Sequence, residues 1–233
     1  MILPQPAAPI IERPSSNNSP SPSSSGTRLL ARTALTPAPH WPKPSRMALK
    51  AIIYKANVSF SDLDRNVYAD HALTLARHPS ETEERLMIRL LAYILNAPAT
   101  RDHGSLEFGK DMWEADEPAL SQYDLTGLLL HWIELGLPEE KRLVRLCGRS
   151  KKVTVYSFSS TTPAWWAAMK DRMSRVHNLT VWQIPAAQSQ ALGALATRSM
   201  DLQVTLQDDG LWISVGNTSV EITPLRLFGG SGE

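Results

Sequence analysis

Two glutamates occupy positions where an ionised carboxylate needs a partner. Glu134 lies inside the run LLLHWIELG, residues 128–136, which is apolar almost throughout. Glu83 precedes a set of apolar side chains at the offsets that place residues on one face of a helix. A charged carboxylate in an apolar setting is destabilising unless it pairs with a cation or binds a metal ion. Both residues are therefore candidates for a polar or metal site, and a helix-capping role is the alternative for Glu83.

The elements that must carry these glutamates can be predicted from the apolar pattern. Residues 128–136 read as a central strand covered on both faces, and alternation places Trp132 and Glu134 on the same face. The sequence Ser80-Glu81-Thr82-Glu83 is a capping box that predicts a helix start. That helix has one apolar stripe, and its pattern places Arg85 and Arg89 on the opposite side. A second helix is predicted to open at Pro138, directly after the strand.

The remaining patterns predict one α/β domain. Residues 48–60 and 67–76 form a predicted hairpin, and a second group of hairpin strands closes the chain around the turn Asp209-Gly210. Strands and helices alternate between these ends, which implies right-handed parallel crossovers. The expected architecture is a single mixed β-sheet with helices on both faces and antiparallel hairpins at the N- and C-terminal ends. His131, in the central strand, is expected to be a buried histidine with a satisfied hydrogen bond.

Several ordered stretches strongly resemble the YaeQ family of bacterial proteins. They are MALKAIIYKA, LDRNVYADHALTLARHPSETEERLMIRLLAY, ADEPAL, WIELGLPEEKR and TVYSF. The resemblance covers essentially all of residues 47–227. It implies a fold that is a variant of the PD-(D/E)xK nucleases and a location in the bacterial cytoplasm.

The resemblance also implies a metal site. In those nucleases a helix supplies a glutamate, a hairpin supplies an aspartate, and the next strand carries Glu-x-Lys around Mg²⁺, which prefers hard oxygen ligands. Carried over to this chain, Glu83 matches the helix glutamate and Glu134 the strand glutamate. Asp124, in DLTG, is the preferred aspartate, and Asp116, in ADEP, is the alternative. The expected metal ligands are Glu83, Asp116 or Asp124, and Glu134, with Mg²⁺ as the ion.

The lysine of the nuclease pattern is missing, because Gly136 stands two residues after Glu134. Some members of the superfamily carry that charge on the following helix, where this chain has Lys141, Arg142 and Arg145. We expect Lys141 or Arg142 to complete the site with Glu134. An arginine holds a phosphate well but is a poor base, since it stays protonated. The alternative is that these three side chains only solvate an exposed helix face.

Composition limits the further expectations. Residues 1–46 hold ten of the 17 prolines and a serine-rich block, which predicts a disordered tail, with Met47 as the expected start of translation or, alternatively, a transit-like peptide. Residues 228–233 are expected to be a flexible C-terminal tail. Five of the 24 basic residues and one of the 23 acidic residues lie in 1–46, which leaves 19 basic and 22 acidic residues in 47–233. The folded part is therefore not a generally basic nucleic-acid binder.

Two functions follow as hypotheses. The first is a Mg²⁺-dependent nuclease or phosphodiesterase acting on nucleic acid. The alternative is a catalytically inactive protein of the nuclease fold that binds nucleic acid or a protein partner. No membrane partner is expected, because no run of about 18 apolar residues is present. No small-molecule cofactor is expected besides Mg²⁺.

Overall fold

A computed structural model describes residues 50–97 and 104–229. The expectations for residues 1–46, for a start at Met47 and for residues 230–233 lie outside the described part of the chain. Four helices are seen in the described part: α1 (Glu83–Asn96), α2 (Glu140–Cys147), α3 (Thr162–Met173) and α4 (Ala186–Gly193). None of the helices in these two ranges is both long and apolar enough to cross a membrane.

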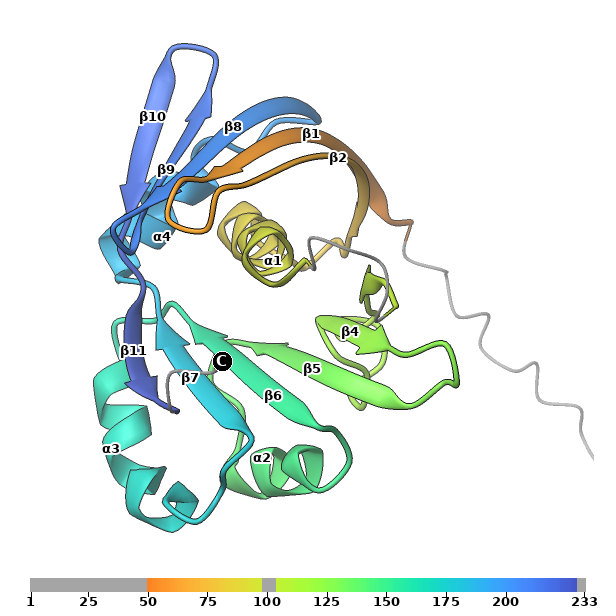
Figure 1. The fold of residues 1–233 in the computed structure, drawn as a ribbon, viewed down its shortest axis with the longest axis vertical. Helices are drawn as coiled ribbons and strands as arrows, with labels where there is room; N and C mark the ends of the chain where they lie inside the picture. Colours follow the sequence, from red (N-terminus) through yellow and green to blue (C-terminus); the bar gives the residue numbers. More distant parts are fainter. Residues whose placement is uncertain (1–49, 98–103, 230–233) are drawn as a thin grey trace, which may run out of the picture. The chain divides into compact units, whose positions relative to one another are not determined.

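The strands form two sheets, so the prediction of a single sheet was wrong (Figure 1). The first sheet has the order β10-β9-β8-β1-β2, and its strands are β1 (Ile52–Asp62), β2 (Val67–Arg77), β8 (Ser199–Gln207), β9 (Gly210–Val215) and β10 (Thr218–Ile222). The second has the order β11-β7-β6-β5-β4-β3, and its strands are β3 (Leu106–Phe108), β4 (Leu120–Tyr123), β5 (Leu129–Leu135), β6 (Lys152–Ser157), β7 (Leu179–Gln183) and β11 (Leu225–Phe228).

The second sheet separates from the first because the two terminal hairpins pair with each other. β1 and β2 are antiparallel, as predicted, and β8 then pairs with β1 in parallel. The expected parallel crossovers remain within the second sheet, where β5, β6 and β7 run in the same direction. β11, which the sequence patterns did not reveal, pairs with β7 and extends through Phe228, one residue beyond the predicted end of the domain.

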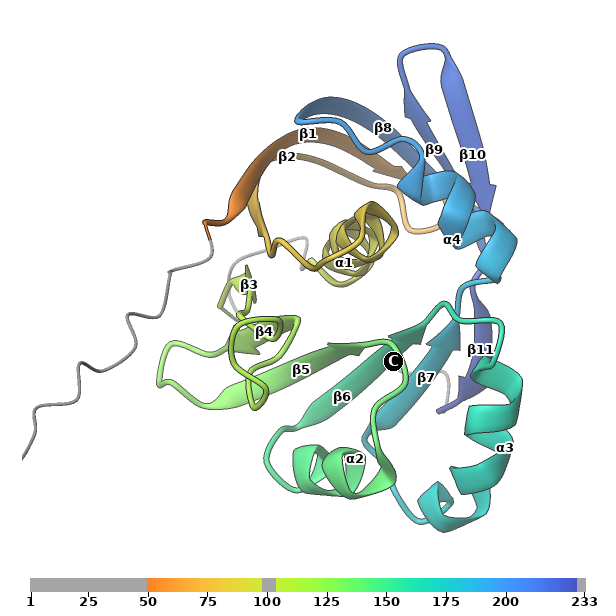
Figure 2. The same cartoon turned by 180° about the vertical axis from the view of Figure 1, so that it is seen from behind.

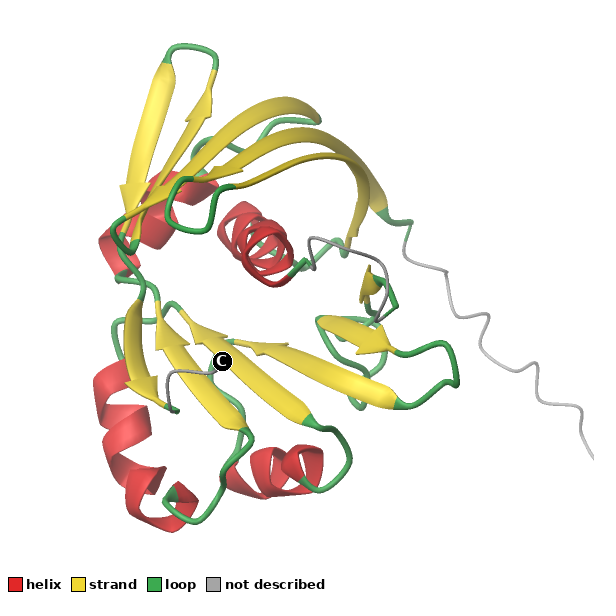
Figure 3. Cartoon of the chain, in the orientation of Figure 1, coloured by secondary structure: helices red, strands yellow, loops and turns green. Residues whose placement is uncertain are grey.

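Helix α1 lies between the two sheets, as Figure 3 shows. Its predicted stripe is buried, but Ile88, Ala92 and Arg89 are buried as well. A helix packed between two sheets is covered around more of its circumference than one on a single sheet face. This is why Arg89, predicted to lie on the open side, is only 4% exposed. The core around α1 combines apolar residues from both sheets and α4.

Helices α2 and α3 cover the other face of the second sheet (Figure 2). A separate apolar cluster forms there, with Leu143 of α2, Met173 of α3 and Val155 of β6 among its fully buried members. The second sheet therefore has helices on both faces, as predicted, with α1 on one face and α2 and α3 on the other. Strand β5 lies inside this sheet between β4 and β6, so its side chains point alternately into two different cores.

The start of α1 differs from the predicted one by two residues. The N-cap is Thr82, whose hydroxyl accepts a hydrogen bond from the backbone N–H of Arg85 at 3.1 Å. Helix α4 packs closely on this end, because Gly193 allows it: a Cβ atom there would lie 2.8 Å from the Cα atom of Glu84. Any larger residue at position 193 would push α4 away from the first turn of α1.

Candidate functional site

Glu134 is buried in β5, on the α2 side of the second sheet. It is 8% exposed, and its neighbour on the same face, Trp132, belongs to the apolar cluster beneath α2 and α3. The indole N–H of Trp132 donates a hydrogen bond to Oε2 of Glu134 at 2.8 Å. The prediction that alternation places these two side chains together is therefore met by a direct contact.

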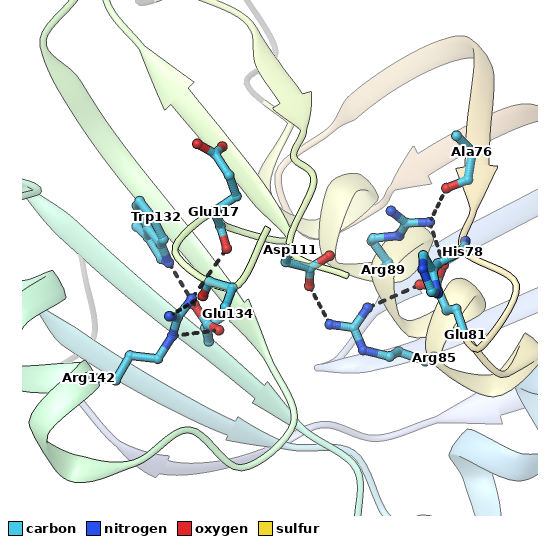
Figure 4. A network of polar contacts seen from close by, with 11 residues as sticks. Ala76, His78, Glu81, Arg85, Arg89, Asp111, Glu117, Trp132, Glu134 and Arg142 are labelled. Carbon is cyan, nitrogen blue, oxygen red and sulfur yellow. Dashed lines mark hydrogen bonds and ion pairs between the residues drawn. The ribbon is translucent and has the colours of Figure 1, made fainter. Parts of the chain in front are cut away.

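Arg142 of α2 reaches back to Glu134 and binds it with two nitrogens (Figure 4). Its Nε donates to Oε1 at 3.1 Å and its Nη2 to Oε2 at 3.2 Å. The same guanidinium donates to two backbone carbonyls, from Nη1 to Ala115 at 2.5 Å and from Nη2 to Glu117 at 3.3 Å. A two-pronged contact of this kind fixes direction as well as distance. Arg142 therefore ties the segment before β4 to the carboxylate of β5.

Burial and hydrogen bonding shift the pKa of the Glu134 carboxyl group in opposite directions. Loss of hydration raises the pKa of its carboxyl group, and this is the larger effect. The bonds from Trp132 and Arg142 lower the pKa, and the nearby carboxylate of Asp111 raises it further. The net direction is upward from the ordinary value, although the carboxylate has a cationic partner. Ionised Glu134 is therefore held in the fold by Arg142 rather than by water.

The backbone conformation at position 136 favours glycine over the lysine of the nuclease pattern. Its φ is +94°, a conformation that side-chain-bearing L-residues rarely adopt, and its N–H donates to the carbonyl of Tyr156 at 2.9 Å. A Cβ atom at this position would meet no atom within 4 Å, so the constraint is the dihedral angle and not the space. The chain must turn sharply out of β5 here to start the connection to α2.

The other basic candidates have different surroundings. Lys141 is exposed. Arg145 donates from Nη2 to Oδ1 of Asp116 at 2.8 Å, in a pair that is largely exposed to solvent. Of the three basic residues proposed to reach Glu134, Arg142 is the one that contacts it.

The predicted carboxylates do not form one cluster, although Asp116 lies near the arginine that binds Glu134: its Oδ1 is 3.9 Å from Nη1 of Arg142. Glu83 is exposed at the start of α1, where its Oε1 accepts a hydrogen bond from the hydroxyl of Tyr54 at 3.0 Å. Asp116 pairs with Arg145. Asp124 closes the turn between β4 and β5: one oxygen accepts bonds from the backbone N–H groups of Thr126 and Leu128 and from the Thr126 hydroxyl. These bonds lower the pKa of Asp124.

In the described residues, no three His, Cys, Asp or Glu side chains lie close enough together to hold a metal ion. Both oxygens of Glu134 already accept hydrogen bonds from Arg142 or Trp132. The donor set around Glu134 thus suits a guanidinium rather than Mg²⁺, which requires several oxygen ligands. The metal and catalytic roles assigned to Glu83, Asp116, Asp124, Glu134, Lys141 and Arg142 stay predictions.

A second buried ionic cluster was missed by the sequence reasoning. Glu81, at 2% exposure, accepts from Arg85 at 3.1 Å and from Arg89 at 3.0 Å, as Figure 4 shows. Arg85 also bonds Oδ2 of Asp111, while the buried Oδ1 has no hydrogen-bond partner among the described residues. The signal was present in the spacing, because Glu81 precedes Arg85 by four residues and Arg89 by eight.

The sequence Asp116-Glu117-Pro118, which has the residue types of a helix start, lies in the irregular segment before β4. No helix is assigned between β3 and β4, and Ala119 extends the contact with β5 by donating its N–H to the carbonyl of Ile133 at 3.1 Å. The carbonyls of Ala115 and Glu117, which a helix would use internally, are instead held by Arg142.

Comparison with known proteins agrees with this description. The family model described as YaeQ protein matches residues 47–224. Relatives named YaeQ from Salmonella typhi and Escherichia coli (strain K12) are 43% and 42% identical over 178 residues, which is 76% of this chain and 95% of each relative.

Two crystal structures of YaeQ proteins have the same fold. The protein from Xanthomonas axonopodis pv. citri is 40% identical, with a TM-score of 0.73 over 78% of this chain and 100% of that chain. The protein from Pseudomonas syringae is 30% identical, with a TM-score of 0.71 over 78% of this chain and 98% of that chain. With the family model spanning more than half of its length and close relatives covered almost end to end, the chain belongs to the YaeQ family.

Proposed function

We propose that this chain works as a non-catalytic binding protein on a nuclease-like scaffold, with another protein as its partner. The observation that carries the proposal is the double contact between Arg142 and Glu134. A catalytic carboxylate needs oxygen lone pairs that are available to a metal ion or a water molecule. Here the lone pairs are directed at a guanidinium and an indole N–H, and the guanidinium is also committed to two backbone carbonyls.

The turn between β4 and β5 supports a protein partner. Leu125 and Leu128, in this turn, are 87% and 46% exposed, and Tyr123, the last residue of β4 beside it, is 45% exposed. Asp124 keeps the turn ordered through its hydrogen bonds to Thr126 and Leu128. Large apolar side chains on an ordered surface turn favour contact with another protein, because they bury area at a small entropic cost. The excess of acidic residues in 47–233 disfavours a nucleic-acid backbone.

The competing function is the Mg²⁺-dependent phosphodiesterase of the first hypothesis. One observation favours it: among the described residues, Asp111 has a buried oxygen without a hydrogen-bond partner, and its negative charge raises the pKa of Glu134. A cation bound near both buried carboxylates would offset their negative charges. The residues as arranged do not supply a ligand set for Mg²⁺, so no catalytic step is derived from it.

A cleavage assay separates the two functions. The full chain and its Glu134→Gln variant are incubated with supercoiled plasmid and single-stranded DNA or RNA, with Mg²⁺ or Mn²⁺. We expect no cleavage by either protein. Cleavage that requires the metal and disappears in Glu134→Gln would refute the proposal, provided that circular dichroism shows both proteins to be folded.

A binding assay tests the partner. The immobilised chain is incubated with an extract of the cells that encode it, and retained proteins are compared between wild type, Leu125→Ser and the control Leu63→Ser. Leu63 is also an exposed leucine, at 46%, but it lies in the β1–β2 turn. A specific partner should be lost in Leu125→Ser and kept in Leu63→Ser. Retention of nucleic acid alone, with affinity that falls steeply with salt, would overturn the choice of a protein partner.

A further inference from the structure

A polar cavity of about 390 Å³ opens on the side of β5 opposite to Glu134. Its polar lining comes from four elements and one turn: Arg65 from the β1–β2 turn, Asn96 from α1, Gln122 from β4, His131 from β5 and Lys152 from β6. His131 and Glu134 are three residues apart in one strand, so their side chains leave on opposite faces. The volume falls within the range of small-molecule sites.

The floor of the cavity is fixed by hydrogen bonds. The ring Nε2 of His131 lies 2.8 Å from the hydroxyl of Thr154, and Asn96 donates to the hydroxyl of Tyr156 at 2.7 Å. Burial lowers the pKa of His131 to about 3, so the imidazole is neutral at physiological pH. The cavity thus has rigid, neutral polar groups at its base and contributes no histidine charge.

Two cationic side chains line the same cavity, and they differ in whether an acidic partner lies nearby. Arg65 has an acidic partner, since its Nε lies 3.5 Å from Oδ2 of the buried Asp62. No ion pair is formed by Lys152 with any carboxylate in residues 50–97 and 104–229. Reduced hydration lowers the pKa of Lys152, and the charge of Arg65 lowers it further. The ammonium group of Lys152 therefore shares its surroundings with another cation and has no carboxylate ion-pair partner in the described residues.

The end of α1 offsets this positive charge only in part. The helix ends at Asn96 and carries no basic residue in its last turn, so the carbonyl end of its dipole is close to the cavity. That end is equivalent to about half a negative charge. Asp62, Arg65 and Lys152 together contribute one net positive charge. An excess of positive charge therefore remains in a site with polar walls and a limited volume.

We propose that this cavity binds a small phosphate monoester, with Lys152 and Arg65 contacting the phosphate and with Asn96 and Gln122 lining the remainder of the site. A phosphate monoester carries between one and two negative charges near pH 7, which suits two cations that otherwise repel each other. The volume accommodates a sugar phosphate or a mononucleotide but not a folded nucleic acid. The site is independent of the protein partner proposed above.

Isothermal titration calorimetry of the full chain at low ionic strength tests the proposal. The probes are ribose 5-phosphate and adenosine 5′-monophosphate, with ribose, adenosine, inorganic phosphate and succinate as comparisons. We expect saturable binding of at least one phosphate monoester with one site per chain, and none of its unphosphorylated counterpart. Lys152→Met should weaken that binding by about tenfold or more, as expected for loss of one charge-assisted contact.

The matched control is Lys151→Met, the neighbouring exposed lysine that does not line the cavity. Both lysines are exposed, but Lys151 does not line the cavity, so Lys151→Met should leave the dissociation constant within about twofold. Three results would each overturn the proposal: no saturable binding of either monoester at millimolar concentration, equal affinity in Lys152→Met, or binding of succinate or free phosphate as tight as that of the monoesters. Unfolding curves of both variants show whether the fold is intact.

Discussion

Replacing Arg142 by methionine should destabilise the protein through Glu134 more than through the lost contacts of the arginine itself. The side chains of the pair are 19% and 10% exposed, so water cannot readily take over the role of the guanidinium. Removing one partner of a buried pair costs about 3–5 kcal/mol, and the partial exposure of Arg142 places the expected loss near the lower end, at about 3 kcal/mol. For a domain of this size, that corresponds to a fall in Tm of about 6–12 °C.

The effect should depend on the charge of Glu134. Because burial raises the pKa of Glu134 in the folded state, ionisation of Glu134 weakens folding. This penalty is absent below the unfolded pKa near 4.5, grows between that pH and the raised folded pKa, and is constant above it. Without Arg142 the folded pKa rises further, so Arg142→Met should lose less stability at pH 5 than at pH 8. The second substitution Glu134→Gln should restore part of the loss at pH 8, since a neutral amide needs no counter-charge.

Urea unfolding followed by circular dichroism measures all four proteins of this double-mutant cycle. The single variant Glu134→Gln should be close to wild type, because Arg142 is 19% exposed and keeps two backbone carbonyl acceptors, and the amide oxygen can still accept a hydrogen bond from Trp132. If Arg142→Met were as stable as wild type, or if Glu134→Gln gave no recovery in the double variant, Glu134 would not depend on Arg142 for its place in the fold.

Three further predictions concern the surroundings of the site. Glu81→Gln should lower the free energy of unfolding by about 2–3 kcal/mol, because Arg85 and Arg89 lose a buried partner, whereas Glu83→Gln, at an exposed position two residues later, should cost less than about 1 kcal/mol in the same urea titration. The ring of His131 should not titrate above about pH 4 in nuclear magnetic resonance spectra, and a titration near pH 6.5 would contradict this. Because the pKa of His131 is about 3 when folded and near 6.5 when unfolded, the wild-type protein should lose stability as pH falls below 6.5, and His131→Gln should lose less. Gly136→Lys places a lysine two residues after Glu134, as in the nuclease pattern. It should lower the free energy of unfolding by about 1–2 kcal/mol through the positive φ alone, and it should confer no metal-dependent cleavage. Unchanged stability would show that the turn tolerates a side chain.

Local patterns predicted the elements well and their assembly less well. The β1–β2 hairpin, the central strand around Glu134 and the alternation that joins Glu134 to Trp132 all follow from apolar spacing. The two-sheet arrangement does not, because it depends on β8 pairing with β1 across more than a hundred residues of sequence. A single-sheet order and a two-sheet order satisfy the same strand patterns, and only the long-range pairing distinguishes them.

The site was predicted in part for the same reason. A buried carboxylate at position 134 demands a counter-charge, and the following helix offered three basic residues from which the structure selects Arg142. Asp124 was predicted as a metal ligand, and in the structure its hydrogen bonds close the turn between β4 and β5. Spacing along the sequence can identify polar residues with a local purpose, but it cannot tell a turn-closing aspartate from a ligand in space.

The loop between β3 and β4 connects the two buried ionic clusters, because each cluster contains an arginine that binds this loop. Asp111 near its start is held by Arg85 of α1, and the carbonyls of Ala115 and Glu117 near its end are held by Arg142 of α2. Apolar residues of similar volume would stabilise such positions at least as well as buried ion pairs do, so stability alone does not explain them. Directional contacts do what apolar packing cannot: they fix one conformation of an irregular segment between helices on opposite faces of the second sheet. On this reasoning Glu134 is a structural anchor whose partner, Arg142, also holds the loop. The surfaces that we propose for binding are separate from it, at the β4–β5 turn and in the cavity lined by Lys152.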